Sequence, residues 1–307
     1  MSEYTVRYIN CRAESDAAAF IHDCEEHYHR QIHMAADEII RDHVRCPIVL
    51  INGPSSSGKT TTNDRIARIV ELAGVHAEML SMDDYYRTAT EYDQPMDDEN
   101  GVSDLESPEC MDLERLSSDL KRLAAGEEVS VPRFDFETRT SIPHDRTLQL
   151  GKDEVIMIEG IHSFNPVIMG DLAHRATSIY LSVASALVPE KGARLEPYML
   201  RFLRRAMRDS LFRSSPVEAT LRQWNSVRRG ERLYISPYRG QADIAIDTFL
   251  PYEVNILMER LTPVLRECRD ALKDAGLAPV SDILGTISPI AYEGRIPEDS
   301  VLHEFIG

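Results

Sequence analysis

The sequence predicts an α/β protein with a doubly wound parallel sheet flanked by helices. Short apolar runs, of the kind found in strands buried on both faces, alternate with longer segments whose apolar residues recur at helical spacing. The first run, residues 48–51, leads into a glycine-rich loop at 53–60, and a helical segment follows. Strand, loop and helix in this order form the first unit of such a sheet.

The 307 residues, 43% of them hydrophobic, suffice for one large core with appendages. We expect an N-terminal helical appendage at 1–45, a core at 46–260, and a C-terminal extension at 261–307 packed on that core. Periodicity and flanking breakers predict the following elements. The strands are 48–51, 75–80, 153–160, 178–183 and 243–246, and the helices are 14–44, 60–73, 112–125, 196–213 and 252–273, before an irregular tail from 276.

Charge is distributed unevenly along this acidic chain, whose net charge is −17. Residues 83–112 carry eleven acidic residues and one arginine, with Pro95 and Gly101 as breakers, which predicts a long surface loop. Residues 201–239 hold ten arginines and three acidic residues. An acidic protein offers no basic footprint for nucleic acid, but a local arginine concentration suits an anionic ligand such as a nucleotide polyphosphate. We therefore expect an arginine-rich helical lid at about 190–240.

The sequence gives no sign of a membrane or secretory protein. No run approaches about 18 uncharged apolar residues, and the first four residues, Met-Ser-Glu-Tyr, lack the layout of a signal peptide. The five scattered cysteines include no C-x-x-C pair, which predicts reduced thiols. We expect a cytoplasmic protein with neither a membrane nor a nucleic-acid partner, and the sequence leaves open whether it forms a homo-oligomer.

Gly53 to Thr60 matches G-x-x-x-x-G-K-[ST], the signature of a phosphate-binding P-loop. In such a loop the backbone N–H groups surround the phosphates, the lysine reaches the β- and γ-phosphates, and the last hydroxyl binds Mg²⁺. The helix that follows adds its positive dipole end. The predicted ATP-binding residues of the loop are Gly53, Ser55, Ser56, Ser57, Gly58, Lys59, Thr60 and Thr61.

Two carboxylates follow or end predicted core strands. Asp83 comes after the second strand and Glu159 ends the third, so both belong at the carboxyl edge of the sheet, where ligands bind in doubly wound folds. With Thr60 they are the predicted ligands of Mg²⁺. Asp83 could alternatively cap a helix, and His162 could be either a substrate contact or a hydrogen-bonded loop histidine.

Arginines 201, 204, 205 and 208 are spaced i, i+3, i+4 and i+7 in the predicted helix 196–213. A one-sided arginine stripe suits a lid that closes over phosphates, and we expect Arg205 to bind ATP. The alternative is a solvated face paired with acids elsewhere. Trp224, the only tryptophan, is expected to pack within the lid.

From about Pro47 to Tyr252 the chain resembles the uridine kinase/phosphoribulokinase family of P-loop kinases. Six motifs in family order carry the resemblance: Gly53–Thr61, Asp83–Arg87, Val131–Phe136, Ile158–Gly160, Arg204–Asp209 and Ala242–Asp243. The resemblance implies a fold of the P-loop NTPase type. The ending, residues 296–307, resembles a bacterial subgroup of nucleoside kinase-like proteins.

The resemblance also implies roles for residues. It makes Asp83 the general base or a metal carboxylate, Tyr86 and Phe134 walls of the acceptor pocket, and Arg208 and Arg213 lid cations. The predicted catalytic residues are Lys59, Asp83, Glu159 and Arg208, and Arg205 and Arg213 join the ATP-binding set. The predicted substrate-binding residues are Asp84, Tyr86, Arg87, Phe134, Arg139 and His162.

Two positions depart from the family pattern. Uridine kinases usually have tyrosine where Phe134 stands and histidine where Arg139 stands, and both help to hold the nucleoside. The loss of a hydrogen-bonding group at a specificity site can change substrate preference by orders of magnitude. The departures therefore predict weaker use of uridine, and Arg139 would suit an anionic acceptor.

We predict an ATP-dependent, Mg²⁺-dependent kinase that phosphorylates a primary hydroxyl, most simply of a nucleoside such as uridine or cytidine. The alternative enzyme performs the same chemistry on a sugar phosphate or a polyol. A different class is a regulatory protein that senses ATP without transfer. The presence of Lys59, Asp83, Glu159 and the arginines weighs against that class.

Overall fold

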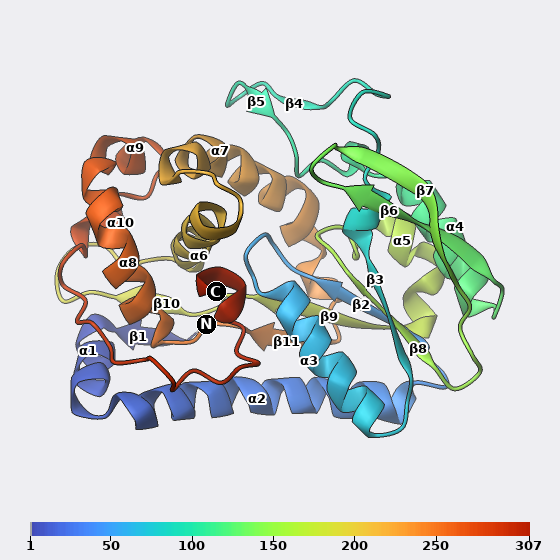
Figure 1. Cartoon of the computed structure of the whole chain (residues 1–307), viewed down its shortest axis with the longest axis horizontal. Helices are drawn as coiled ribbons and strands as arrows, with labels where there is room; N and C mark the ends of the chain where they lie inside the picture. Colours follow the sequence, from blue (N-terminus) through green and yellow to red (C-terminus); the bar gives the residue numbers. More distant parts are fainter. Residues whose placement is uncertain (1) are drawn as a thin grey trace.

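The computed structural model describes residues 2–307. Its central sheet has five strands in the order β11-β9-β2-β8-β3, and every pairing within the sheet is parallel. The strands are β2 Ile48–Asn52, β3 Ala77–Ser81, β8 Val155–Glu159, β9 Ala176–Ser182 and β11 Ile244–Asp247. Each predicted core strand is present to within two residues. The predicted α/β class with a doubly wound parallel sheet is confirmed (Figure 1).

Helices cover both faces of this sheet because alternate side chains of its strands point to opposite faces. In β2, Val49 and Ile51 belong to one buried cluster, which contains α2 and α3, whereas Ile48 and Leu50 belong to the other, which contains the leucines of α4. The helices are α1 Val6–Ser15, α2 Ala17–Asp42, α3 Lys59–Leu72, α4 Leu113–Ala124, α5 Pro166–Met169, α6 Pro197–Phe212, α7 Val217–Gly230, α8 Glu253–Glu267, α9 Arg269–Asp274, α10 Ala278–Asp282 and α11 His303–Ile306. No helix within residues 2–307 is long and apolar enough to cross a bilayer.

Two of the predicted helices are broken. The N-terminal helix starts earlier than expected and is interrupted at Asp16, whose carboxylate caps α2 by accepting from the backbone N–H of Ala19. The helix predicted at 252–273 ends at Glu267 and resumes as α9. The tail that we expected to be irregular contains two short helices, α10 and α11.

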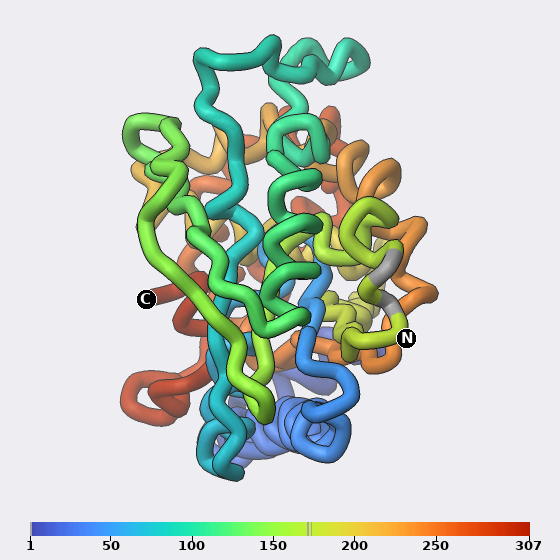
Figure 2. Tube along the Cα trace, turned by 90° about the vertical axis from the view of Figure 1, so that its right-hand side faces the viewer, coloured from blue at the N-terminus to red at the C-terminus, as the bar shows by residue number. Residues whose placement is uncertain are grey.

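Several strands were not predicted. The largest addition is an antiparallel hairpin of β6 Val129–Asp135 and β7 Thr140–Leu148, which extends beside α4 (Figures 1 and 2). Most residues of β7 are exposed, so its sequence lacks the apolar alternation by which a half-buried strand is recognised. The other new strands form two-stranded sheets: β1 Glu3–Thr5 with β10 Ala186–Val188, and β4 Met96–Asp97 with β5 Val102–Ser103.

The acidic segment 83–112 is only partly a surface loop. Asp97, Asp104 and Glu106 are buried, because arginines of the lid segment neutralise them. Arg229 lies 2.9 Å from Asp104 and 3.5 Å from Asp97. The prediction of a purely exposed loop was therefore wrong for these three residues, and two segments of opposite charge instead pack together.

The arginines of α6 do not form a single outward stripe. Arg204 is fully buried, with Nη2 donating to Glu253 Oε2 at 2.7 Å and to the carbonyl of Thr248 at 2.6 Å. Arg201 is also buried and pairs with Glu231. The expected one-sided stripe is wrong for these two arginines, which hold α6 to the core, while Arg205 and Arg208 face a cavity. Trp224 packs edge to face on Phe202 of α6, as expected.

The buried Arg204–Glu253 pair predicts a large loss of stability when one partner is neutralised. Glu253→Gln leaves a buried guanidinium without its counter-charge, so we expect a loss of about 3–5 kcal/mol of unfolding free energy, measured by urea denaturation. The control is Glu259→Gln, an exposed glutamate of the same helix, with an expected change within about 0.5 kcal/mol. Equal effects of the two changes would contradict the structural role of the pair.

Candidate active site

The loop between β2 and α3 is shaped by its two glycines. A Cβ on Gly53 would lie 2.1 Å from the carbonyl oxygen of Leu181, and a Cβ on Gly58 would lie 2.4 Å from the Cγ2 of Val301. Gly58 also has φ +81°, a conformation that favours glycine. These constraints turn the loop so that α3 starts at Lys59, with its N–H groups and positive dipole end at the loop.

Several polar groups of this loop lack partners, as expected of a site for an anion. The hydroxyl oxygens of Ser56 and Ser57 are buried without a hydrogen bond to any part of the chain that the structure describes. Lys59 Nζ donates to the carbonyl of Pro54 at 3.3 Å, which leaves further ammonium donors, and the exposed Thr60 lines the adjoining cavity. Leaving buried polar groups unpaired costs about 1–3 kcal/mol each, a cost that a bound phosphate would remove.

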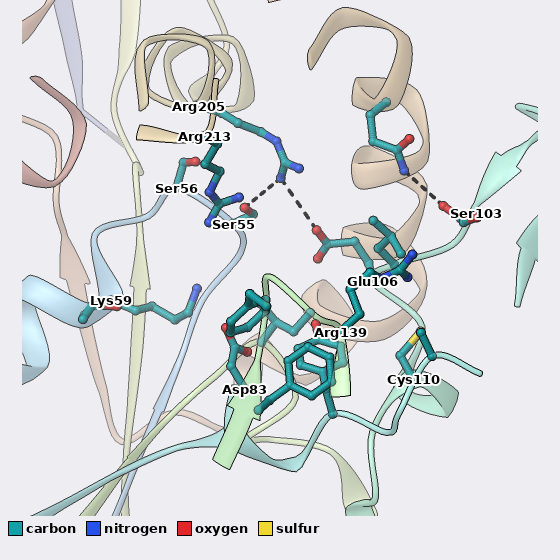
Figure 3. Close-up of a pocket in the computed structure, with 18 of the residues that line it drawn as sticks. Ser55, Ser56, Lys59, Asp83, Ser103, Glu106, Cys110, Arg139, Arg205 and Arg213 are labelled. Atoms are coloured by element: carbon teal, nitrogen blue, oxygen red, sulfur yellow. Dashed lines mark hydrogen bonds and ion pairs between the residues drawn. The ribbon is translucent and has the colours of Figure 1, made fainter. Parts of the chain in front are cut away.

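The parallel pairing of β3 and β8 brings two carboxylates to the loop. Ser81 and Glu159 are register partners at the ends of these strands, and Ser81 Oγ donates to Glu159 Oε1 at 2.9 Å. Asp83 follows in a short 3₁₀ helix, Met82–Tyr85. Asp83 and Glu159 line one cavity with Lys59, as Figure 3 shows for Asp83 and Lys59.

The two carboxylates carry more negative charge than Lys59 can balance. Burial and the charge of Asp83 raise the pKa of Glu159 to about 7, against the opposing influence of Lys59. Burial also raises the pKa of Asp83, and Lys59 again opposes the shift. Two carboxylates and the Thr60 hydroxyl are hard oxygen ligands of the kind that Mg²⁺ takes from proteins while it keeps waters and phosphate oxygens. These residues therefore fit a magnesium ion.

Three arginines form the wall opposite the carboxylates. Arg205 Nη1 donates to Ser55 Oγ at 2.9 Å and lies 3.9 Å from Glu106 (Figure 3). Arg205, Arg208 and Arg213 all lie within 3.6 Å of the carboxylate of Asp209. Burial, together with the charges of Arg213 and Arg205, lowers the pKa of Arg208 to about 10 despite Asp209. A polyanion in the cavity would relieve this excess of positive charge.

The other end of the cavity is aromatic. The rings of Tyr86 and Phe134 lie 5.5 Å apart, and the Phe136 ring lies 5.0 Å from that of Phe134. Arg87 also lines the cavity, and Arg139 Nη2 donates to Gln94 Oε1 at 3.2 Å. The whole cavity has a volume of about 570 Å³, which is within the range of small-ligand sites.

The structure brings most of the predicted site residues into this one cavity. Its lining includes Ser55, Ser56, Lys59, Thr60, Asp83, Tyr86, Arg87, Phe134, Arg139, Glu159, Arg205, Arg208 and Arg213. Gly53, Ser57 and Gly58 are part of the P-loop but not of the lining. Thr61 also lies outside the lining, and its Oγ1 donates to Glu304 Oε2 at 3.2 Å. Two predicted substrate residues lie outside the lining. Asp84 accepts from the N–H of Phe134 at 3.4 Å, and His162 is buried near Tyr234, where burial lowers its pKa to about 4.

Two carboxylates in the cavity were not predicted. Glu106 reaches it from the acidic segment, and Glu304 reaches it from α11. Eleven acids in one segment gave no reason to select Glu106, and Glu304 lies 91 residues (304 − 213) after Arg213, the nearest predicted site residue in sequence. Only the contacts of the folded chain distinguish these two glutamates.

Comparison with known proteins finds similarity to one family. Residues 48–190 match the model of the "Phosphoribulokinase / Uridine kinase family". This segment is just under half of the chain, and over it the chain is similar to that family. The similarity supports an ATP-dependent kinase, a phosphotransferase with an alcohol acceptor. Kinases of this family generally use ATP with Mg²⁺.

Individual relatives are distant. Uridine kinase of Staphylococcus aureus (strain Newman) is 29% identical over 200 residues, which span 65% of this chain and 86% of that protein. Uridine-cytidine kinase-like 1 of Mus musculus is 29% identical over 197 residues, or 64% of this chain and 32% of that protein. Among solved structures, phosphoribulokinase from Rhodobacter spheroides is 18% identical with a TM-score of 0.40, covering 66% of this chain and 70% of that one.

Lys59→Ala should nearly abolish phosphoryl transfer by this kinase while leaving its thermal stability unchanged. The ammonium makes one 3.3 Å contact in the loop, whereas loss of a cation from the transition state costs several kcal/mol. Turnover is measured as ADP release, beside the midpoint of thermal unfolding. Lys152→Ala, at an exposed lysine, is the control. Retention of more than about a tenth of the activity in Lys59→Ala would contradict the phosphate role.

Proposed function

We propose that this kinase transfers the γ-phosphate of ATP to the primary hydroxyl of a nucleoside of the uridine or cytidine type. One observation carries the proposal: a single cavity is lined by the P-loop, three arginines, an aromatic cluster and Asp83, whose charge acts on both Lys59 and Tyr86. This set of groups suits a donor polyphosphate, a reacting hydroxyl and a planar acceptor.

At the donor end, the loop N–H groups and Lys59 hold the β- and γ-phosphates, and Arg205, Arg208 and Arg213 neutralise the group in transfer. Mg²⁺, held by Thr60, Glu159 and Asp83 beside the phosphates, would supply further charge neutralisation. Because all these groups are fixed before the reaction, little reorganisation opposes the transition state.

Between the two ends, Asp83 accepts the proton of the acceptor hydroxyl. Its carboxylate is partly withdrawn from water, and burial raises its pKa, so it is a stronger base than an exposed aspartate. The transfer then joins the hydroxyl oxygen to the γ-phosphorus while ADP departs.

At the acceptor end, the rings of Tyr86 and Phe134 can stack on a pyrimidine. Glu106 is buried, and its Oε2 has no hydrogen-bond partner within the described chain, so it is suited to accept from the hydroxyls of a sugar.

The second candidate acceptor is a sugar phosphate or a polyol. Arg87 and Arg139 support it, because both cations line the cavity. An ATP-sensing regulatory protein is the third candidate. The assembled carboxylates weigh against it, since sensing alone would not require a base beside the γ-phosphate.

Asp83→Asn should lower kcat by about 10²- to 10⁴-fold with little change in KM for ATP, because the substitution keeps the shape but removes the base. Asp84→Asn is the matched comparison, since Asp84 lies outside the cavity lining and accepts a hydrogen bond from the backbone N–H of Phe134. A crippled Asp84→Asn enzyme beside a nearly normal Asp83→Asn enzyme would show that the base is the other aspartate.

The acceptor is tested by a panel of nucleosides, sugar phosphates and polyols in an ADP-release assay. Phe134 lacks the hydroxyl that uridine kinases usually have there, and each lost contact corresponds to about 1–3 kcal/mol. Uridine should therefore be used at lower kcat/KM than is typical of kinases, and Phe134→Tyr with Arg139→His should raise that value. Histidine suits position 139, where φ is +56°.

A wild-type kcat/KM for uridine of order 10⁴ M⁻¹s⁻¹ or better would show that the two departures are neutral. Selective turnover of a sugar phosphate would replace the nucleoside by the second candidate. Binding of ATP without turnover of any acceptor would favour the regulatory protein.

A further inference from the structure

The last residues of the chain, 296–307, form a wall beside the P-loop that the proposed function does not use. Val301, Leu302 and Phe305 are fully buried, and the Cγ2 of Val301 lies against Gly58. Figure 1 shows α11, the dark red helix at the C-terminus, in the middle of the molecule beside α6, and the two helices are in contact.

This segment is anchored to the core by polar contacts as well. Ser300 Oγ and Tyr252 Oη both donate to Glu25 Oε1 of α2, at 2.5 and 2.6 Å. The Phe305 ring lies 4.8 Å from the guanidinium carbon of the buried Arg204. Because these contacts are buried, the segment is a fixed part of the site and not a mobile flap.

Glu304 is the one carboxylate that the segment places in the cavity, as far as the described residues show. Its Oε2 accepts from Thr61 Oγ1 at 3.2 Å, and its Oε1 lies 4.0 Å from Arg208 Nη1. Thr61 is in the first turn of α3, two residues after Lys59. Glu304 thus lies beside the helix turn that borders the phosphate cradle.

The chemistry of a nucleotide limits what Glu304 can bind. An ionised carboxylate only accepts hydrogen bonds, and phosphate oxygens bring further negative charge, so the phosphates are not its ligand. The ribose is attached to the α-phosphate, next to the cradle, and its hydroxyls are donors. In dinucleotide-binding folds an acidic residue similarly binds a ribose hydroxyl.

We propose that Glu304 is a specificity-determining residue of the donor site, whose carboxylate accepts a hydrogen bond from a ribose hydroxyl of ATP. The proposal rests on the proposed function only in taking ATP as the donor. It gives the C-terminal segment a role in discriminating ribonucleotides from their deoxy forms.

The test is calorimetric binding of ADP, 2′-deoxy-ADP and 3′-deoxy-ADP to the full chain without any acceptor. A hydrogen bond to a charged group predicts that wild type binds ADP about 10- to 100-fold more tightly than at least one deoxy form. Glu304→Ala should remove this preference. Glu304→Gln should restore part of it, since the amide oxygen still accepts, and Glu298→Ala, an exposed glutamate of the same segment, should leave it intact.

The decisive quantity is the ratio of the affinity for ADP to the affinity for each deoxy form. Removal of a negative charge alone alters the binding of all three nucleotides alike and leaves this ratio unchanged. Equal affinity of wild type for the three would overturn the proposal. So would a Glu304→Ala variant that strengthens or weakens all three by one factor, which would make Glu304 a general electrostatic barrier. If wild type binds none of them, the proposed ATP donor itself fails, and that result is distinct from a uniform change.

Discussion

The parallel pairing of β2 with β8, and of β8 with β3, is the constraint on which the site depends. Because the strands run in one direction and in fixed register, their carboxyl ends meet at one edge. The P-loop leaves β2 there, Glu159 ends β8, and Asp83 follows β3. A shift of one residue in this pairing would turn Glu159 to the opposite face and separate the two carboxylates.

Around this edge the chain balances charge by pairing segments that are distant in sequence. Most arginines of the lid segment are matched to acids. Arg229 pairs with Asp104, Arg201 with Glu231, and Arg204 with Glu253. Arg205, Arg208 and Arg213, which line the cavity, share the carboxylate of Asp209, and Glu106 and Glu304 lie 3.9 and 4.0 Å from Arg205 and Arg208. Three arginines are therefore gathered where a polyphosphate would lie.

The sequence was sufficient for what is local or strongly periodic. The P-loop signature and five apolar runs predicted the central sheet and the position of Lys59, Asp83 and Glu159. It was insufficient where a residue's role depends on distant partners. The burial of Arg204 requires Glu253, and the positions of Glu106 and Glu304 result from tertiary packing that leaves no spacing pattern. The hairpin of β6 and β7 was missed because its exposed side chains show no alternation.

The proposed function requires that the cavity transfers a phosphoryl group from ATP to a primary alcohol. Phosphorus NMR of the kinase with ATP, Mg²⁺ and a mixture of cytidine and uridine follows that transfer directly. We expect a phosphomonoester on the 5′ carbon of a nucleoside, formed in equal amount to ADP. ADP accompanied by inorganic phosphate alone, with no phosphorylated nucleoside, would contradict it.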